Sequence, residues 1–274
     1  PATWEGMYQL YARGLTSGLE LETPFWVNEE AMTFDILPDY GPVGAMINFA
    51  GTGFTVGGTW SAYLGPVLVD EGAVAIDGTL ASSFTVPIMG AGTYTFKLVD
   101  DERGYRVQTT FSVDFNDIAY IGVTAASTDG LANTQALVDI AEEDVNSYLS
   151  GIGETFTIQC LVMDNEADED ITLQNTVEFH ERGIDIIAGH GWSTQCAATI
   201  GYVDANDMFM FSSSSTAVSL ALPDNLFRLT TNEAVQGGII AQLYSKLGVD
   251  AVIIYYSDWW YGQEVCQYIE DACA

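Results

Sequence analysis

Hydroxyl-bearing side chains follow two short apolar runs in the middle of the chain. Ser193 and Thr194 come after the run 184–189. A second set of serine and threonine residues, 212–216, lies at the end of the run 207–212. Runs of this length bounded by glycine or serine are typical of strands buried on both faces of a parallel sheet. Ligand sites in such sheets lie outside the carboxyl ends of the strands, so we expect the two loops to meet over one crevice. Their hydroxyls, and the free N–H groups where a helix begins at Ser193, suit a small carboxylate.

Other residues that could take part in binding or catalysis also have structural interpretations. Serine and threonine are common helix N-caps and turn residues, so a structural role for both loops stays open. His190 lies beside Ser193, but GHGWS is not the GxSxG nucleophile elbow, and we interpret His190 as structural. The acidic segment 164–170 lacks the order of a calcium loop. We therefore predict no catalytic residue, no metal site, no cofactor and no enzymatic activity.

Composition narrows the class of protein. The 274 residues are 48% apolar and carry 38 Asp+Glu against 7 Lys+Arg, a formal net charge of −31. Such a charge repels nucleic acid and anionic membranes and favours cations as partners, while the apolar content is too high for a disordered acidic segment. The sequence has no run of 18 apolar residues, and its first residues lack the basic and apolar parts of a signal peptide.

The first 115 residues show short alternating runs and frequent glycine and proline turns, as in an all-β sandwich. A shift of 86 residues aligns GMYQLYARGLTSGLELETPFWV, from Gly6, with GTYTFKLVDDERGYRVQTTFSV, from Gly92. The second copy follows a full set of strands, whereas the first follows none. We therefore expect residues 1–35 to be the terminal hairpin of a preceding domain, and the chain to open inside that domain.

Residues 36–115 contain a more specific pattern. The segments PDYGPVGAMINFAGTGF, FTVPIMGAGTYTFKLVD and TTFSV, with glycine and proline at the turns, resemble the IPT/TIG group of immunoglobulin-like domains. The resemblance implies an immunoglobulin-like sandwich that acts as a spacer or contact module outside the cytoplasm. It implies no chemistry.

The remaining residues, 116–274, alternate between strand and helix patterns, which indicates a parallel sheet with right-handed crossovers. In the first helix, apolar residues recur at three- and four-residue intervals between Leu137 and Leu149. Strands are predicted at 118–124, 156–163, 184–189, 207–212, 226–229 and 249–256, and helices at 137–149, from 170, at 193–203, at 232–247 and from 262. The predicted fold class is thus multidomain: a β-sandwich followed by an α/β lobe.

Six strings in this order, IAYIGV, VMDNEADED, IDIIAGHGWST, FMFSSSST, NLFRLTTNEAVQGGIIAQLYSKLG and VIIYYSDWWYGQE, resemble the amino-terminal lobe of type I periplasmic binding proteins, especially the branched-chain amino acid group of ABC transporters. The resemblance implies that Ser193, with Thr194 in the same loop, and Thr216 hold a ligand carboxylate. It implies that the Ser215 carbonyl receives the ligand ammonium and that Tyr261 covers the ligand.

The sequence also departs from that family. We expect the second lobe to be absent from this chain, and the loop after the first strand is short and lacks the usual aromatic residue. Two functions stay open: an extracellular or cell-surface component that binds a small amino acid or similar solute, or a structural subunit of a surface layer, sheath or filament. In the second case the partners are further copies of the chain, a longer parent chain, or cations.

Overall fold

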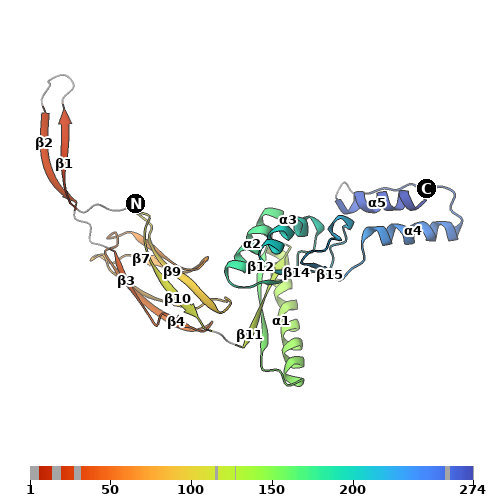
Figure 1. Ribbon diagram of the computed structural model, residues 1–274, viewed down its shortest axis with the longest axis horizontal. Helices are drawn as coiled ribbons and strands as arrows, with labels where there is room; N and C mark the ends of the chain where they lie inside the picture. Colours follow the sequence, from red (N-terminus) through yellow and green to blue (C-terminus); the bar gives the residue numbers. More distant parts are fainter. Residues whose placement is uncertain are drawn as a thin grey trace. The chain divides into compact units, whose positions relative to one another are not determined.

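A computed structural model describes residues 6–13, 20–27, 32–114, 117–126, 128–256 and 260–273 (Figure 1). The chain divides into two compact units, Pro1–Pro87 with Thr93–Ser112 and Ile88–Gly92 with Val113–Ala274. The domain boundaries expected at residues 35 and 115 stay predictions. No helix among the described residues is long and apolar enough to cross a membrane.

The first unit contains a two-stranded hairpin and two larger sheets. In the hairpin, β1 (Gly6–Arg13) pairs antiparallel with β2 (Glu20–Val27). One larger sheet has three strands in the order β3 (Thr33–Leu37), β5 (Met46–Thr52), β8 (Leu80–Thr85). The other has five strands in the order β4 (Tyr40–Gly41), β10 (Tyr105–Val113), β9 (Gly92–Asp100), β6 (Thr59–Leu64), β7 (Val67–Ala73).

Aromatic side chains join the three-stranded and five-stranded sheets. The ring of Phe84 stacks on Phe96 with the centroids 5.3 Å apart, and Phe49 meets Trp60 edge to face at 5.4 Å. Strand β5 alternates exposed and buried residues, as expected when one face of a sheet covers a core. The two sheets therefore form a two-layer all-β structure. Its assignment to the IPT/TIG group stays a prediction.

The second unit is built on a parallel sheet of five strands. Their order is β12 (Thr157–Asp164), β11 (Ile118–Ala125), β13 (Ile186–Ala188), β14 (Phe209–Ser212), β15 (Leu226–Arg228), and each neighbouring pair is parallel. The helices are α1 (Thr128–Gly151), α2 (Glu169–Glu181), α3 (Ser193–Ala205), α4 (Glu233–Leu247) and α5 (Trp260–Cys273), with a short 3-10 turn η1 (Val218–Leu220). The predicted α/β alternation is confirmed.

Local sequence explains where these helices begin and how closely they pack. The Asp168 carboxylate caps α2 by accepting hydrogen bonds from the amides of Asp170 and Ile171, at 2.9 and 3.0 Å. Gly122 in β11 lets α2 approach, because a Cβ there would lie 2.8 Å from the ring of Phe179.

The prediction of a strand at 249–256 is wrong. The structure shows no strand in this segment, and the side chains of Ile253 and Tyr255 are 98% and 99% exposed. The run has the composition of a buried strand, but a strand also needs a neighbour for its main-chain hydrogen bonds. No strand among the described residues pairs with it.

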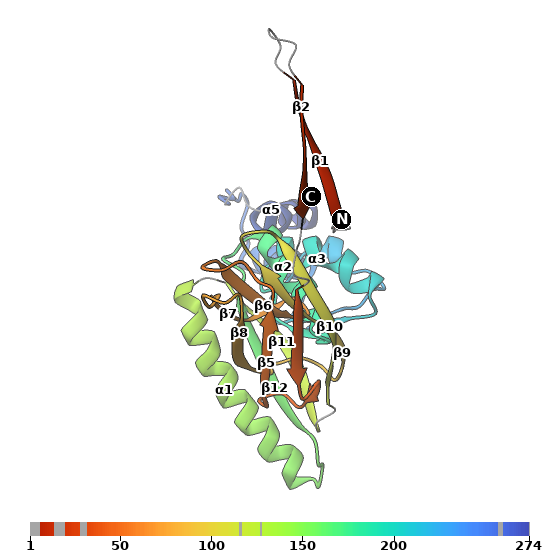
Figure 2. The same ribbon diagram turned by 90° about the vertical axis from the view of Figure 1, so that its left-hand side faces the viewer.

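Helix α1 is confirmed as a helix, but its apolar stripe points away from the sheet. Leu137 is 69% exposed and Tyr148 is 66% exposed. Figure 2 shows α1 running along the sheet beside β12, which is the edge strand. The helix therefore covers that edge with its other face.

Candidate functional site

The two hydroxyl-rich loops come together at the carboxyl ends of β13 and β14. These strands are neighbours in the sheet, and Ala188 lies opposite Phe211. The Oγ atoms of Ser193 and Ser215 are 3.1 Å apart, and the amide of Ala217 donates to Ser193 Oγ at 3.2 Å. Ser193, Ser215 and Thr216, here named the hydroxyl cluster, thus lie at one end of the sheet.

Hydrogen bonds between the loops fix this arrangement. The buried Ser212 hydroxyl donates to the carbonyl of His190 at 2.9 Å and accepts from the amide of Ser215 at 3.1 Å. One residue earlier in the second loop, Ser214 Oγ donates to the carbonyl of Gly191 at 2.7 Å. The serines of the second loop therefore bind the main chain of the first loop.

The first turn of α3 adds main-chain donors to the cluster. Its N-cap is Trp192, whose indole has no acceptor atom and so cannot cap the amides of that turn. Helix N-termini carry a partial positive charge and attract anions. Ser193 is the first residue of this helix and Thr194, partly exposed, the second.

Thr216 contacts a residue that the sequence did not single out. Its hydroxyl donates to Glu233 Oε1 at 2.6 Å, and the Glu233 amide donates to the Thr216 carbonyl at 3.3 Å. Glu233 is fully buried, and its Oε2 has no hydrogen-bond partner among the described residues. A glutamate that directly follows an N-cap such as Asn232 reads as an ordinary complement to the helix dipole, so nothing local marked it as a site residue.

Arg228 is a second residue beside the cluster that the sequence did not single out. Its Nη1 donates to the carbonyl of Ala217 at 2.6 Å and approaches the carbonyl of Ser215 at 3.4 Å. The Ser215 carbonyl was expected to receive a ligand ammonium. In this structure a guanidinium already lies beside that carbonyl.

Tyr261 contacts α4, the helix that begins at Glu233. Its hydroxyl donates to Gln236 Oε1 at 3.1 Å, and Gln236 lies one turn after Glu233. On the same helix as Tyr261, Glu264 accepts from the amide of Val218 at 3.3 Å and from the indole of Trp260 at 2.6 Å. Helix α5 is therefore attached to the segment that follows Thr216.

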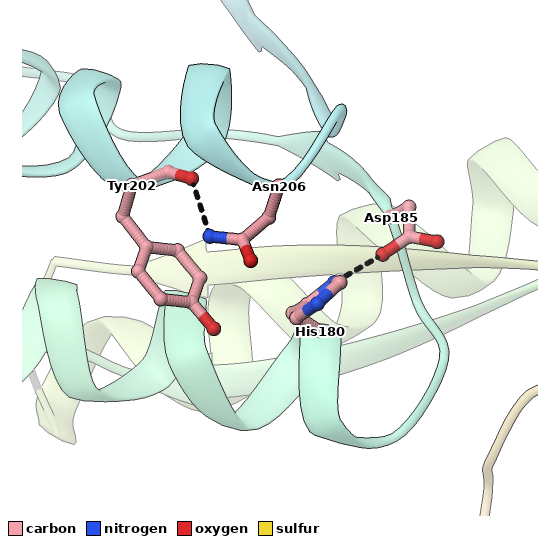
Figure 3. A network of polar contacts seen from close by, with 4 residues as sticks. All are labelled: His180, Asp185, Tyr202 and Asn206. Carbon is pink, nitrogen blue, oxygen red and sulfur yellow. Dashed lines mark hydrogen bonds and ion pairs between the residues drawn. The ribbon is translucent and has the colours of Figure 1, made fainter.

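The two histidines lie outside this cluster. His190 is buried, with Nδ1 3.1 Å from the hydroxyl of Thr124 and Nε2 3.1 Å from the hydroxyl of Thr176. Burial lowers the pKa of His190 to about 4, so the ring is neutral near pH 7 and acts structurally. His180, at the end of α2, points to Asp185, with His180 Nδ1 2.7 Å from Asp185 Oδ1 (Figure 3).

The second unit has a cavity apart from the hydroxyl cluster, and the described residues offer no metal site. In the part of the chain that the structure describes, no group of three or more His, Cys, Asp or Glu side chains is placed to hold a metal ion. A cavity of about 760 Å³ lies between α4, residues 249–256 and α5. None of the five predicted site residues lines this cavity.

A family model described as the receptor family ligand binding region matches residues 134–274, just over half of the chain. The chain belongs to this family. The match supports the part of the expected resemblance that concerns the α/β lobe. Because it begins at residue 134, the IPT/TIG character of residues 36–115 stays a prediction.

One relative and several solved structures are similar to part of the chain. An uncharacterized protein of Methanocaldococcus jannaschii, MJ1266, is 28% identical over 164 residues, 56% of this chain and 39% of the relative. An ABC transporter substrate-binding protein of Desulfitobacterium hafniense, also solved with leucine, is 22% identical over 57% of this chain and 47% of its own, with a TM-score of 0.49. The branched-chain amino acid binding protein LivJ of Streptococcus pneumoniae, solved with isoleucine, is 19% identical over 57% and 46%, also with a TM-score of 0.49. The chain spans less than half the length of each.

Proposed function

We propose that the second unit binds a small solute, such as an amino acid, at the hydroxyl cluster, and that the protein acts outside the cytoplasm. The observation that carries the proposal is the meeting of Ser193, at the uncapped start of α3, with Ser215 and Ala217. Convergent hydroxyls beside a helix N-terminus are suited to an anionic group of a small molecule. The family match, to a ligand binding region, supports the same conclusion.

Calorimetric titration with leucine, isoleucine, valine and glycine tests this function. We expect saturable heat with at least one of these amino acids, and weaker binding after Ser193→Ala, because the cluster loses a hydroxyl. Ser213→Ala is the matched control, since Ser213 is an exposed residue of the same loop. Absence of heat with every amino acid, or equal weakening by the two substitutions, would contradict the proposal.

A second candidate is a subunit of an extracellular assembly. The observation in its favour is the exposed apolar stripe of α1, which includes Leu137, Ile140 and Tyr148. Under this candidate the protein sediments as oligomers that Ile140→Asp dissociates. Sedimentation as a monomer at all concentrations, together with amino acid binding, would leave solute capture as the function.

A further inference from the structure

We propose that Glu233 binds the amine of the solute, so that the site selects amine-bearing molecules over carboxylic acids that lack an amine. This inference rests on the proposed function and deepens it, because it names the class of solute and the residue that recognises it.

The first argument is the state of the Glu233 side chain. An ionised carboxylate has two oxygens that accept hydrogen bonds, and buried polar atoms nearly always have a partner. Glu233 is fully buried, Oε1 accepts from Thr216, and Oε2 has no partner among the described residues. One buried acceptor thus has no partner among the described residues, and it belongs to the same carboxylate that accepts from Thr216.

The second argument is the direction of the bond between Thr216 and Glu233. A hydroxyl has one hydrogen, and Thr216 donates it to Glu233, so the Thr216 oxygen can only accept from a ligand. A ligand carboxylate offers only acceptors and would lie next to a like charge. An ammonium has three donors and matches the two acceptors, Thr216 Oγ1 and Glu233 Oε2.

The charge of Glu233 has a local source of stabilisation. Glu233 is the first residue of α4, where the partial positive charge of the helix favours a carboxylate. Among the described residues no basic side chain forms an ion pair with Glu233. A cationic group on a ligand would therefore form the first ion pair with Glu233 among the described residues.

The remaining polar groups then orient a zwitterion. Arg228 lies at the Ser215 carbonyl, where an ammonium was expected, so that carbonyl is a poor place for a second cation. Ser193 and the start of α3 offer donors for a carboxylate. This arrangement assigns the carboxylate of an amino acid to Ser193 and its ammonium to Glu233 and Thr216.

The test compares three molecules that share an isobutyl group: leucine, 3-methylbutylamine, which lacks the carboxylate, and 4-methylpentanoate, which lacks the amine. Calorimetry on the full-length protein should show binding of leucine and the amine, with the carboxylate at least about tenfold weaker. Glu233→Gln should weaken leucine and the amine by about tenfold or more, because the neutral amide cannot pair with an ammonium. Glu143→Gln removes the same charge from an exposed position of α1 and should change affinity by less than about twofold.

Each result decides between the proposals. Tight binding of 4-methylpentanoate, or leucine binding that survives Glu233→Gln, overturns the role of Glu233 and leaves solute binding intact. Failure of the wild-type protein to bind any of the three overturns both. If circular dichroism shows that Glu233→Gln does not fold, Thr216→Val decides: it should weaken the amine more than the carboxylate, and equal loss for both overturns the inference.

Discussion

The side-chain amide of Asn146 in α1 forms two hydrogen bonds with the main chain of Ile158 in β12. Asn146 Oδ1 accepts from the Ile158 amide at 2.7 Å, and Nδ2 donates to the Ile158 carbonyl at 3.0 Å. On the same helix, Glu142 accepts from the amide of Cys160. Because β12 is an edge strand, these side chains occupy main-chain groups that a neighbouring strand would otherwise bind.

Replacement of Asn146 by alanine should therefore destabilise the second unit. The amide and carbonyl of Ile158 would lose their partners, and a partly buried unpaired group costs about 1–3 kcal/mol. We expect the free energy of unfolding in urea to fall by an amount in that range. Ser147→Ala, at the next and exposed position, should change it by less than about 0.5 kcal/mol. Equal effects of the two substitutions would show that Asn146 does not protect the edge.

The Cys160 thiol should react slowly. Burial, and next the negative charge and hydrogen bond of Glu142, raise the pKa of Cys160 to about 12. With this pKa, Cys160 is almost entirely protonated at pH 8. Because the thiolate is the reactive form, the protonated thiol reacts slowly. All four cysteines are free thiols, and Cys273 is exposed. In timed alkylation with iodoacetamide, read by mass spectrometry, Cys273 should be labelled well before Cys160.

Glu142→Gln provides the control for this labelling experiment. It removes a negative charge beside Cys160, lowers the thiol pKa and should speed alkylation of Cys160 without changing that of Cys273. Labelling of Cys160 at the rate of Cys273 in the folded wild-type protein would contradict the assigned pKa.

The order of strands and helices in the second unit could be predicted because it depends on local patterns. Buried parallel strands read as short apolar runs, and helices as repeats of three and four residues. Two features could not be predicted in this way. The segment 249–256 has a strand composition, but pairing depends on a distant neighbour. The three- and four-residue period of apolar residues around Leu137 predicts a helix. It does not predict that polar residues on the other face of that helix, such as Asn146, cover the edge of a strand.

The candidate site could be predicted in part for a similar reason. Parallel topology brings loops after neighbouring strands together, and Ser193 and Ser215 do meet. Glu233 and Arg228 could not be found, because their importance comes from contacts made across the fold with Thr216 and Ala217. Each on its own looks like a common helix-start or strand-end residue. The binding role of all these residues stays a prediction.

Acid should destabilise the second unit partly through His190. Burial lowers the pKa of this ring from 6.5 to about 4, so the unfolded chain takes up a proton before the folded protein does. The stability from the neutral ring is full above pH 6.5 and is lost as the pH falls toward 4, by roughly 3 kcal/mol at most. His190→Asn removes the titration, and asparagine tolerates the φ of 53° at this position.

The measurement is the free energy of unfolding between pH 7 and 4 for both proteins. The carboxylates of the chain titrate over part of this range as well, but they are the same in both proteins and largely cancel in the difference. We expect a shallower fall for His190→Asn. Parallel curves would show that His190 has the same pKa in the folded and the unfolded protein, which would contradict the lowered pKa.

Two adjacent glycines in α4 should respond in opposite ways to alanine. Helices α4 and α5 lie side by side (Figure 1), and a Cβ on Gly237 would lie 2.6 Å from Tyr268 Cβ and 2.7 Å from its carbonyl carbon. Gly237→Ala therefore forces the helices apart and should cost about 1–3 kcal/mol. A Cβ on Gly238 meets nothing within 4 Å, so Gly238→Ala should stabilise α4 by about 0.5–1 kcal/mol through helix propensity. Thermal unfolding measures both changes, and a loss of stability in Gly238→Ala as large as in Gly237→Ala would refute the close contact of α4 with α5 at Gly237.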